Sequence, residues 1–243
     1  MNTPPNRLQP PRVVKWSSDE LLCNVRREHV VATPELKEKV RHDLWGDMCA
    51  EHDAENLWDH ICNKSGLTYS KEFLAAMHEW RIDEQNHYIG LRQICSYMYE
   101  VGQDEIDHQL DQRKPDFGPI SHFISDEFKI CVVLAYDELV SARGYKMFVE
   151  EFKQFGPKEY VTWVLNASRD EALHYQNFLD VAKVVHHGTR AAVDEIMRDI
   201  VLYETNPEMT YNATFLMDHT EETFERSFLV DCATTVAANF SGL

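Results

Sequence analysis

Several features are missing from this sequence, and each absence argues against a class of protein. No apolar stretch approaches the roughly 20 residues of a membrane-spanning helix. The 9 glycines form no Gly-x-Gly-x-x-Gly, so the usual dinucleotide-binding loop is not present. The 6 cysteines form no Cys-x-x-Cys and most have apolar neighbours, which predicts free thiols in a reducing compartment.

Basic residues are also scarce. The chain has 24 Lys and Arg against 41 Asp and Glu, which gives a formal net charge of −17. This charge disfavours nucleic acid and anionic membrane surfaces as partners, and no basic cluster of the kind that docks an acidic carrier protein is evident. The first 16 residues are rich in Pro and Asn and lack the apolar run of a secretory signal. We therefore expect a cytoplasmic protein that binds neither nucleic acid nor a membrane.

Strand-like alternation of apolar and polar residues is rare, and the fold class is predicted to be all-α. Residues 1–30 are interpreted as an N-terminal arm, and residues 31–243 as a single helical domain. The polar segment 104–119 contains two prolines and a glycine and is predicted to be a long connection. The predicted helices are 33–61, 70–102, 121–155, 157–187, 189–203 and 215–238.

The most informative feature that is present is a pentapeptide that occurs twice. Residues 83–87 and 170–174 both read Asp-Glu-x-x-His, and each copy lies within a long predicted helix. A Glu and a His three residues apart project from the same face of a helix, one turn apart. A single Glu-x-x-His is usually a surface ion pair, whereas two copies in long helices are typical of a site for two metal ions.

Two further glutamates complete this pattern. Glu51 precedes Glu84 by 33 residues, and Glu138 precedes Glu171 by the same number, which predicts two equivalent antiparallel helix pairs. In four-helix carboxylate bundles, two helices give one Glu each and two give Glu-x-x-His. Glu55 lies on the same inner face as Glu51 and is an alternative to it. The predicted ligands are Glu51, Glu84, His87, Glu138, Glu171 and His174.

The types of ligand indicate which metal fits. Four carboxylates with two imidazoles suit iron or manganese better than zinc or copper. A metal-bound His usually donates its other ring N–H to a carboxylate, and Asp83 and Asp170 are placed to serve the His of the opposite motif. Trp80, one turn before Glu84, can offer its indole N–H to the same network. The remaining histidines are expected to be solvated or structural.

These residues resemble the ligand helices of the ferritin-like di-iron oxygenases, and most of all those of the soluble acyl-carrier-protein desaturases. Residues 46–51 read Gly-Asp-Met-Cys-Ala-Glu, similar to the family's Gly-Asp-Met-x-x-Glu, and this favours Glu51 over Glu55. The family places a hydroxyl residue three positions after its third ligand Glu, near the oxygen site. Here that residue is Ser141, expected either to relay a proton to bound oxygen or to be a small packing residue. The other similar segments are 80–87, 137–141 and 170–174.

The resemblance covers about residues 40–200 and is specific for the metal core rather than for the substrate. It implies a ferritin-like four-helix bundle with additional C-terminal helices, two Fe ions, and O2-dependent oxidation of an aliphatic, acyl or small organic substrate. A Mn/Fe pair fits the same ligands. The chain has no flavin, NAD or iron–sulfur motif, so electrons are expected from a redox partner protein such as a ferredoxin. A homodimer is expected by analogy.

Three other functions stay open at this point. Amine N-oxygenases of similar architecture share these ligands and often carry an additional His ligand, which cannot be assigned here. Ferritin-like iron handling requires a large closed oligomer, whereas this chain has a long polar connection and extra C-terminal helices. A radical-generating reductase subunit requires a redox-active Tyr near the metals and a partner-binding C-terminal tail.

Overall fold

The computed structural model describes residues 8–206, 208, 215–219 and 223–240, and over this part of the chain the regular structure is helical, without β-strands. The all-α prediction is therefore confirmed. A π-helical turn at His60–Lys64 extends the second helix, and short 3₁₀ turns lie at Arg27–His29 and Gly118–Ile120. The α-helices are α1 (Ser18–Leu22), α2 (Pro34–Asp59), α3 (Lys71–Tyr99), α4 (Gln103–Leu110), α5 (Glu127–Met147), α6 (Val149–Phe155), α7 (Lys158–Val184), α8 (Arg190–Glu204) and α9 (Arg226–Ala238).

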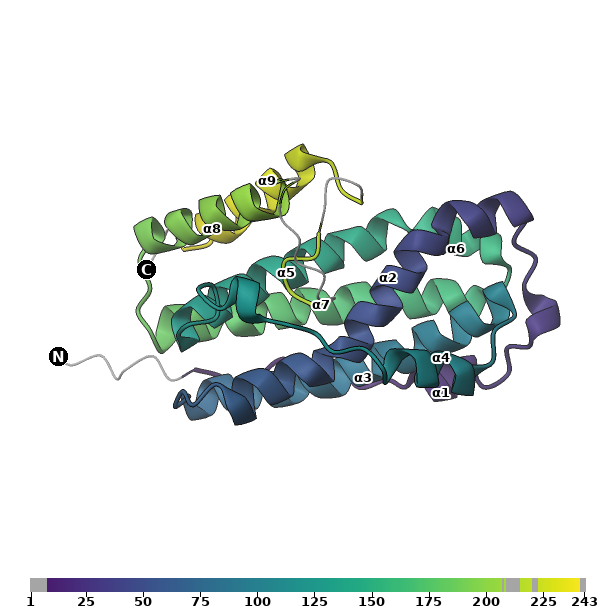
Figure 1. Ribbon diagram of the computed structural model, residues 1–243, viewed down its shortest axis with the longest axis horizontal. Coiled ribbons are helices and arrows are strands. Elements are labelled where there is room, and N and C mark those ends of the chain that lie inside the picture. The colour runs from purple at the N-terminus through teal and green to yellow at the C-terminus, as the bar shows by residue number, and fades with distance from the viewer. Residues whose placement is uncertain (1–7, 207, 209–214, 220–222, 241–243) are drawn as a thin grey trace.

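Four long helices, α2, α3, α5 and α7, form the body of the molecule (Figure 1). The closest packing is within two pairs, α2 with α3 and α5 with α7, and α3 also packs against α7. Helices α8 and α9 lie beside each other and against α5, on the upper side of the view in Figure 1. The two pairs are the equivalent hairpins that the repeated sequence spacing predicts.

Side-chain caps fix where three of the long helices begin. Thr33 accepts a hydrogen bond from the backbone N–H of Leu36 (3.2 Å) at the start of α2, where Pro34 is the first helical residue. Ser70 caps α3 and Asp126 caps α5 in the same way. Each cap satisfies a backbone N–H that has no partner within its own helix.

The apolar core is divided into two clusters along the bundle. One cluster contains Leu57 and Phe178, and the other contains Leu44 and Leu91, all of them fully or almost fully buried. Acidic residues lie between the two clusters on each of the four long helices. Burying carboxylates beside apolar side chains is unfavourable unless their charge is balanced. The residues in this layer are Glu51, Glu84, Glu138 and Glu171.

The predicted long connection 104–119 is wrong in its first half, because α4 occupies Gln103–Leu110. Ile106 and Leu110 are spaced by one helical turn and are buried in the second apolar cluster. Asp107 also accepts hydrogen bonds from Tyr88 and Arg92 of α3. Two apolar residues at helical spacing are enough to hold this otherwise polar segment as a helix on the bundle.

Two other predicted helices are shorter than expected. The predicted helix 121–155 begins only at Glu127 and is divided into α5 and α6. The predicted helix 215–238 is helical only as α9, from Arg226. Leu216 and Met217 have φ values of 66° and 56°, which a right-handed helix cannot contain. The backbone N–H of Met217 instead donates a hydrogen bond to Asp137 of α5 (3.1 Å).

The predicted N-terminal arm, 1–30, is packed onto the bundle in its described part. It contains α1, and Leu22 and Val25 belong to the second apolar cluster. Ser18 is fully buried and accepts a hydrogen bond from the indole N–H of Trp163 in α7 (3.0 Å). The arm therefore contributes to the core. Residues 1–7 lie outside the described part of the chain.

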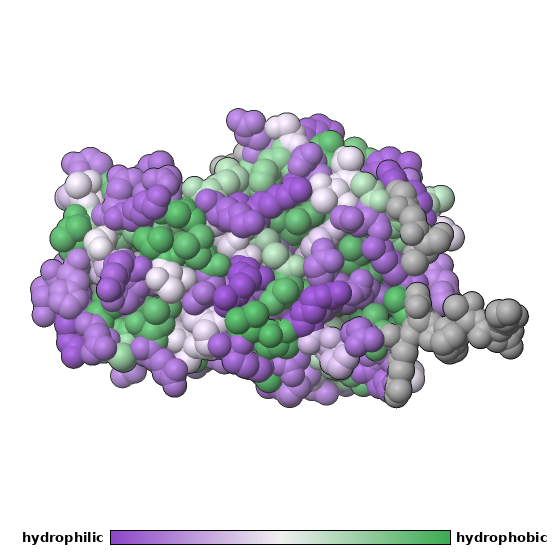
Figure 2. Space-filling view, turned by 180° about the vertical axis from the view of Figure 1, so that it is seen from behind, coloured by the Kyte–Doolittle hydropathy of each residue, from purple (hydrophilic) through white to green (hydrophobic). Residues whose placement is uncertain are grey.

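The surface carries mostly hydrophilic side chains with separate hydrophobic patches between them, as Figure 2 shows for one face. Single exposed apolar residues such as Val31 and Met147 are ordinary in folded proteins. Among the described residues, no helix combines the length and the apolar character that crossing a bilayer requires.

Gly90 allows α3 and α7 to approach closely, and this gives a test of the packing. A Cβ at Gly90 would lie 1.8 Å from Nε1 of the buried Trp163. We expect Gly90→Ala to lower the free energy of unfolding by about 1–3 kcal/mol, because Trp163 must shift and lose its bond to Ser18. Urea denaturation measures this change.

The matched control is Gly46→Ala in α2, where a Cβ would meet nothing within 4 Å. Here the free energy of unfolding should stay unchanged or rise by up to about 1 kcal/mol, since Ala favours the helix. Equal effects at the two positions would contradict the close approach of α3 and α7.

Candidate metal centre

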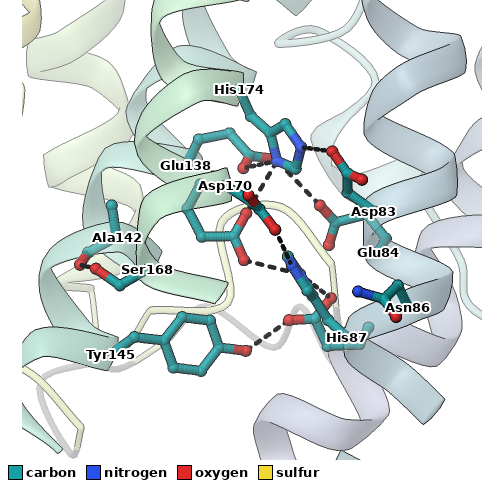
Figure 3. A network of polar contacts seen from close by, with 12 residues as sticks. Asp83, Glu84, Asn86, His87, Glu138, Ala142, Tyr145, Ser168, Asp170 and His174 are labelled. Carbon is teal, nitrogen blue, oxygen red and sulfur yellow. Dashed lines mark hydrogen bonds and ion pairs between the residues drawn. The ribbon is translucent and has the colours of Figure 1, made fainter. Parts of the chain in front are cut away.

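The structure brings the six predicted ligand side chains together in the buried layer between the two apolar clusters. Figure 3 shows the imidazoles of His87 and His174 directed toward carboxylates that come from the neighbouring helices. Each of the six side chains is at least nine-tenths buried. Residues that are up to 123 positions apart in the sequence therefore share one small volume. They are Glu51 on α2, Glu84 and His87 on α3, Glu138 on α5, and Glu171 and His174 on α7.

The six residues form two overlapping groups, each with ligand atoms within 4.8 Å of one another. The first group adds Glu51 and His87 to the shared residues Glu84 and Glu171. The second group adds Glu138 and His174 to the same two shared residues. Each group thus has its own Glu and His from one hairpin. Two groups that share two carboxylates can hold a pair of ions bridged by those carboxylates.

Each of the two histidines directs one ring nitrogen toward a glutamate and the other toward an aspartate. Nδ1 of His87 lies 3.2 Å from Glu171 Oε1, and Nδ1 of His174 lies 3.2 Å from Glu84 Oε1. The opposite nitrogens face the aspartates: His87 Nε2 is 3.4 Å from Asp170 and His174 Nε2 is 3.2 Å from an oxygen of Asp83. Each aspartate thus reaches the His of the other motif. This arrangement places the Nε2 proton on the aspartate side and leaves Nδ1 as the metal-facing atom.

Aromatic donors hold three of the carboxylates. Trp80 donates its indole N–H to Glu138 Oε1 (2.7 Å), and Tyr145 donates its hydroxyl to Glu51 Oε1 (2.5 Å). Asp170 accepts the indole N–H of Trp16. The Trp80 contact follows the position expected from the sequence, whereas Tyr145 and Trp16 were not expected. Tyr145 is seven residues after Glu138 on the same helix face, so periodicity indicates its direction in retrospect. No local signal indicates Trp16.

Glu55 is not part of the cluster, and the alternative ligand assignment is wrong. Its side chain is 50% exposed and forms a two-point ion pair with Arg81 of α3, at 2.5 and 2.6 Å. Glu55 lies four residues beyond Glu51, slightly more than one helical turn, and the extra rotation of about 40° directs it toward Arg81.

All four glutamates line one cavity of about 240 Å³, whereas neither His87 nor His174 does. Ser141 lines the same cavity and is half-buried, one helical turn after Glu138. The structure therefore places Ser141 beside the candidate metal ligands but assigns it no proton transfer. The imidazoles lie behind the carboxylates as seen from the cavity.

A second acidic group adjoins the cavity and was not expected from the sequence. Ligand atoms of Asp137, Asp218 and His219 lie within 4.8 Å of one another. His219 Nδ1 is 3.2 Å from Glu204, which also accepts the hydroxyl hydrogen of Tyr136 (2.5 Å). Burial alone lowers the pKa of His219, but the charges of Asp137 and its other acidic neighbours raise it to about 10. This group joins 215–219 to α5 and α8.

Burial and mutual repulsion shift the titration of the glutamates. Burial raises the pKa of Glu84, and the charges of Glu171 and Glu51 raise it further, to well above the usual range. Burial and the charge of Glu171 raise the pKa of Glu138 in the same way. Glu171 is the exception: burial raises its pKa, but the two imidazoles, His87 first, lower it below its usual value.

The cluster fits a pair of divalent cations. The four glutamates carry four negative charges when ionised, which two divalent ions neutralise. Glu51 Oε2, Glu84 Oε1 and His87 Nδ1 are three of eight buried side-chain atoms that form no hydrogen bond among the described residues, although charged neighbours lie 3.2–3.6 Å from them. Buried polar atoms of this kind are unfavourable without a partner, and all three belong to the predicted ligand set. Oxygen-rich ligation with imidazole suits iron or manganese.

Glu51→Gln and Glu55→Gln form a matched pair that separates the two candidate ligands. We expect Glu51→Gln to bind one ion less per chain than the parent protein, because the group around His87 loses a carboxylate. Glu55→Gln should bind the same number as the parent. Metal analysis after loading with Fe²⁺ or Mn²⁺ measures both.

The metal-free Glu51→Gln protein should unfold at the same or a higher urea concentration than the parent, because the substitution removes buried like-charge repulsion. This second measurement separates a loss of metal binding from a loss of folding. Equal metal content in the two variants would remove Glu51 from the ligand set.

Metal binding is expected to release protons. Burial alone lowers the pKa of His87, but the charges of Glu171 and Glu51 raise it well above the usual value; Glu138 does the same for His174. The metal-free imidazoles therefore hold protons at neutral pH, and an ion must displace them. Metal affinity should rise with pH over the neutral range, and a pH indicator in weakly buffered solution should record the released protons. An affinity independent of pH would contradict this assignment.

Comparisons of the chain with family models, curated proteins and solved structures returned no match. The interpretation of the site therefore depends on the geometry and chemistry of its own residues.

Proposed function

We propose that this chain is a ferritin-like four-helix bundle that holds two metal ions and uses O2 to oxidise a small organic substrate. The observation that carries the proposal is the pair of overlapping ligand groups, which share Glu84 and Glu171 and open onto one cavity. The all-helical arrangement of α2, α3, α5 and α7 supports the bundle. The donor set favours two Fe ions, and a Mn/Fe pair fits the same residues.

The metal pair, when bound, supplies the redox chemistry that activates O2 for attack on an unreactive bond. The protein residues hold and orient this pair. Asp83 and Asp170 fix the imidazole rings through their Nε2 atoms, and Tyr145 and Trp80 fix the outer glutamates. These partners leave the cavity side of the glutamates for substrate, because the imidazoles are on the opposite side.

Two hydroxyl groups on α5 have different roles in this proposal. Ser141 lines the cavity beside Glu138, and Tyr145 lines it with its hydroxyl proton directed at Glu51. Burial and the charge of Glu51 raise the pKa of Tyr145 well above its usual value, so the phenol keeps its proton at neutral pH. We assign proton delivery to Ser141 and positioning of Glu51 to Tyr145.

The proposed overall reaction transfers four electrons to O2. Reduction of O2 to two waters takes four electrons, of which the substrate supplies two and an external reductant supplies two. The chain carries no flavin, NAD or iron–sulfur motif, so the reductant is a separate redox protein such as a ferredoxin. Insertion of one oxygen atom with release of one water has the same electron balance.

The cavity favours a small substrate over an acyl chain. Its volume of about 240 Å³ is below the roughly 300–1,000 Å³ of pockets that enclose drug-sized ligands. Acidic residues line much of it. These features also support amine oxidation, including N-oxygenation, as a second candidate reaction on the same metals.

Oxygen consumption by the reduced protein tests the proposal. Anaerobic protein loaded with Fe²⁺ should change its visible absorbance when O2 is added, because the metal pair is oxidised. Glu171→Ala should abolish the change, since both ligand groups lose a shared carboxylate. Glu55→Gln, outside the cluster, should behave as the parent.

An absence of any O2-dependent change in the Fe²⁺-loaded parent would refute the oxidase proposal. Size-exclusion chromatography separates the remaining alternative, since an iron-storage shell elutes as a particle of about twenty-four subunits. We expect a particle far smaller than that.

A further inference from the structure

The walls of the cavity carry negative charge beyond that of the metal ligands. Asp43 and Asp47 of α2, Asp137 of α5 and Asp218 all line it, in addition to the four glutamates. Among its described lining residues there is no Lys or Arg, although the chain contains 24 of them. A cavity with this lining favours a cation over an anion of the same size.

The four aspartates differ in their partners. Asp137 accepts the backbone N–H of Met217 (3.1 Å), and His219 is shared between Asp137 and Glu204. Asp43 faces His42 at 3.5 Å. Ligand atoms of Asp218 and His219 lie within 4.8 Å of each other, whereas Asp47 belongs to no such group of described residues and lines the cavity near Glu51.

Asp47 and Asp218 line the same cavity as the four glutamates. Asp47 lies one turn before Glu51 on α2, and burial, followed by the charges of Glu51, Asp43 and Asp218, raises its pKa well above the usual value, so a cation beside it favours its ionised form. Two divalent ions would neutralise the four glutamates and leave four aspartates on the cavity wall, with His42 and His219 as the basic residues that line it. A single positive group between Asp47 and Asp218 would relieve the repulsion among these aspartates.

Aromatic side chains complete the lining. Phe148, Phe215 and Phe224 line the cavity together with Tyr145. Phe215 packs edge-on against Trp80, with ring centroids 5.2 Å apart, which fixes its position beside the cluster. Aromatic faces next to carboxylates are the combination that binds ammonium groups, because the ring face attracts a cation while the walls cover its apolar part.

We infer that the substrate of this site is a small organic amine that binds as an ammonium ion, with its positive group between Asp47 and Asp218 and its carbon chain directed toward the glutamates. This inference rests on the proposed function, since it names the substrate class of the same cavity. This substrate class differs from acyl chains and from anionic metabolites. The aspartates repel the anionic metabolites.

Three probes of equal length test the charge preference. The metal-loaded full chain, kept anaerobic, is titrated by calorimetry with n-pentylamine, n-pentanol and pentanoate. The amine is protonated at neutral pH. We expect it to bind at least about tenfold more tightly than the alcohol, and pentanoate to bind most weakly.

Variants locate the ammonium group. Asp218→Asn and Asp47→Asn should each weaken pentylamine binding by about tenfold and leave pentanol binding unchanged. The matched control is Asp104→Asn, which makes the same charge change at an exposed position on α4, outside the cavity. It should leave the binding of all three probes as in the parent.

Metal analysis of the same samples keeps the two proposals apart. A chain that fails to bind metal ends the proposed function. A fully loaded chain that prefers pentanol or pentanoate, or that does not bind pentylamine, overturns the inference on the substrate alone. Equal effects of Asp218→Asn and Asp104→Asn would show that only the net charge of the protein matters, and would also overturn it.

Discussion

Repulsion among four buried glutamates is the constraint on which the rest of this structure depends. Glu51, Glu84, Glu138 and Glu171 are buried between two apolar clusters, where their charges are screened less than at the surface. Two imidazoles offset part of this charge, and two bound metal ions would balance the rest. The surrounding hydrogen bonds orient the carboxylates and imidazoles toward the candidate metal centre.

The two hairpins are equivalent in their ligands and different in their support. Trp80 holds Glu138 on one side, whereas Tyr145 holds Glu51 on the other. Asp170 has a further donor in Trp16, which comes from the N-terminal segment. Such outer contacts commonly change metal affinity by about 10- to 100-fold. The pseudo-symmetry therefore concerns the ligand set, while the segments at the two ends of the chain make the two halves chemically distinct.

The described C-terminal segment, 215–219, forms part of the cavity wall. Leu216 and Met217 adopt left-handed backbone conformations, and the backbone N–H of Met217 is held by Asp137, the residue before a candidate ligand. This turn brings Phe215, Asp218 and His219 to the cavity wall. The four long helices supply the candidate metal ligands and most of the acidic residues of the cavity wall, and Phe215, Asp218 and His219 complete the wall from a segment without regular structure.

The sequence predicted the helical class, a candidate ligand set in which Glu51 and Glu55 were alternatives, and the pairing of each aspartate with the opposite histidine. These predictions depend on helical periodicity, which is local, and on the motif that occurs at both Glu84 and Glu171, each 33 residues after another glutamate. The sequence did not determine the short helix α4, the contacts of Trp16, or the group of Asp137, Asp218 and His219. Such contacts join segments far apart in the chain, and no spacing rule encodes them. Only tertiary packing decided that Glu55 faces Arg81 and that the cavity beside the glutamates is small and acidic.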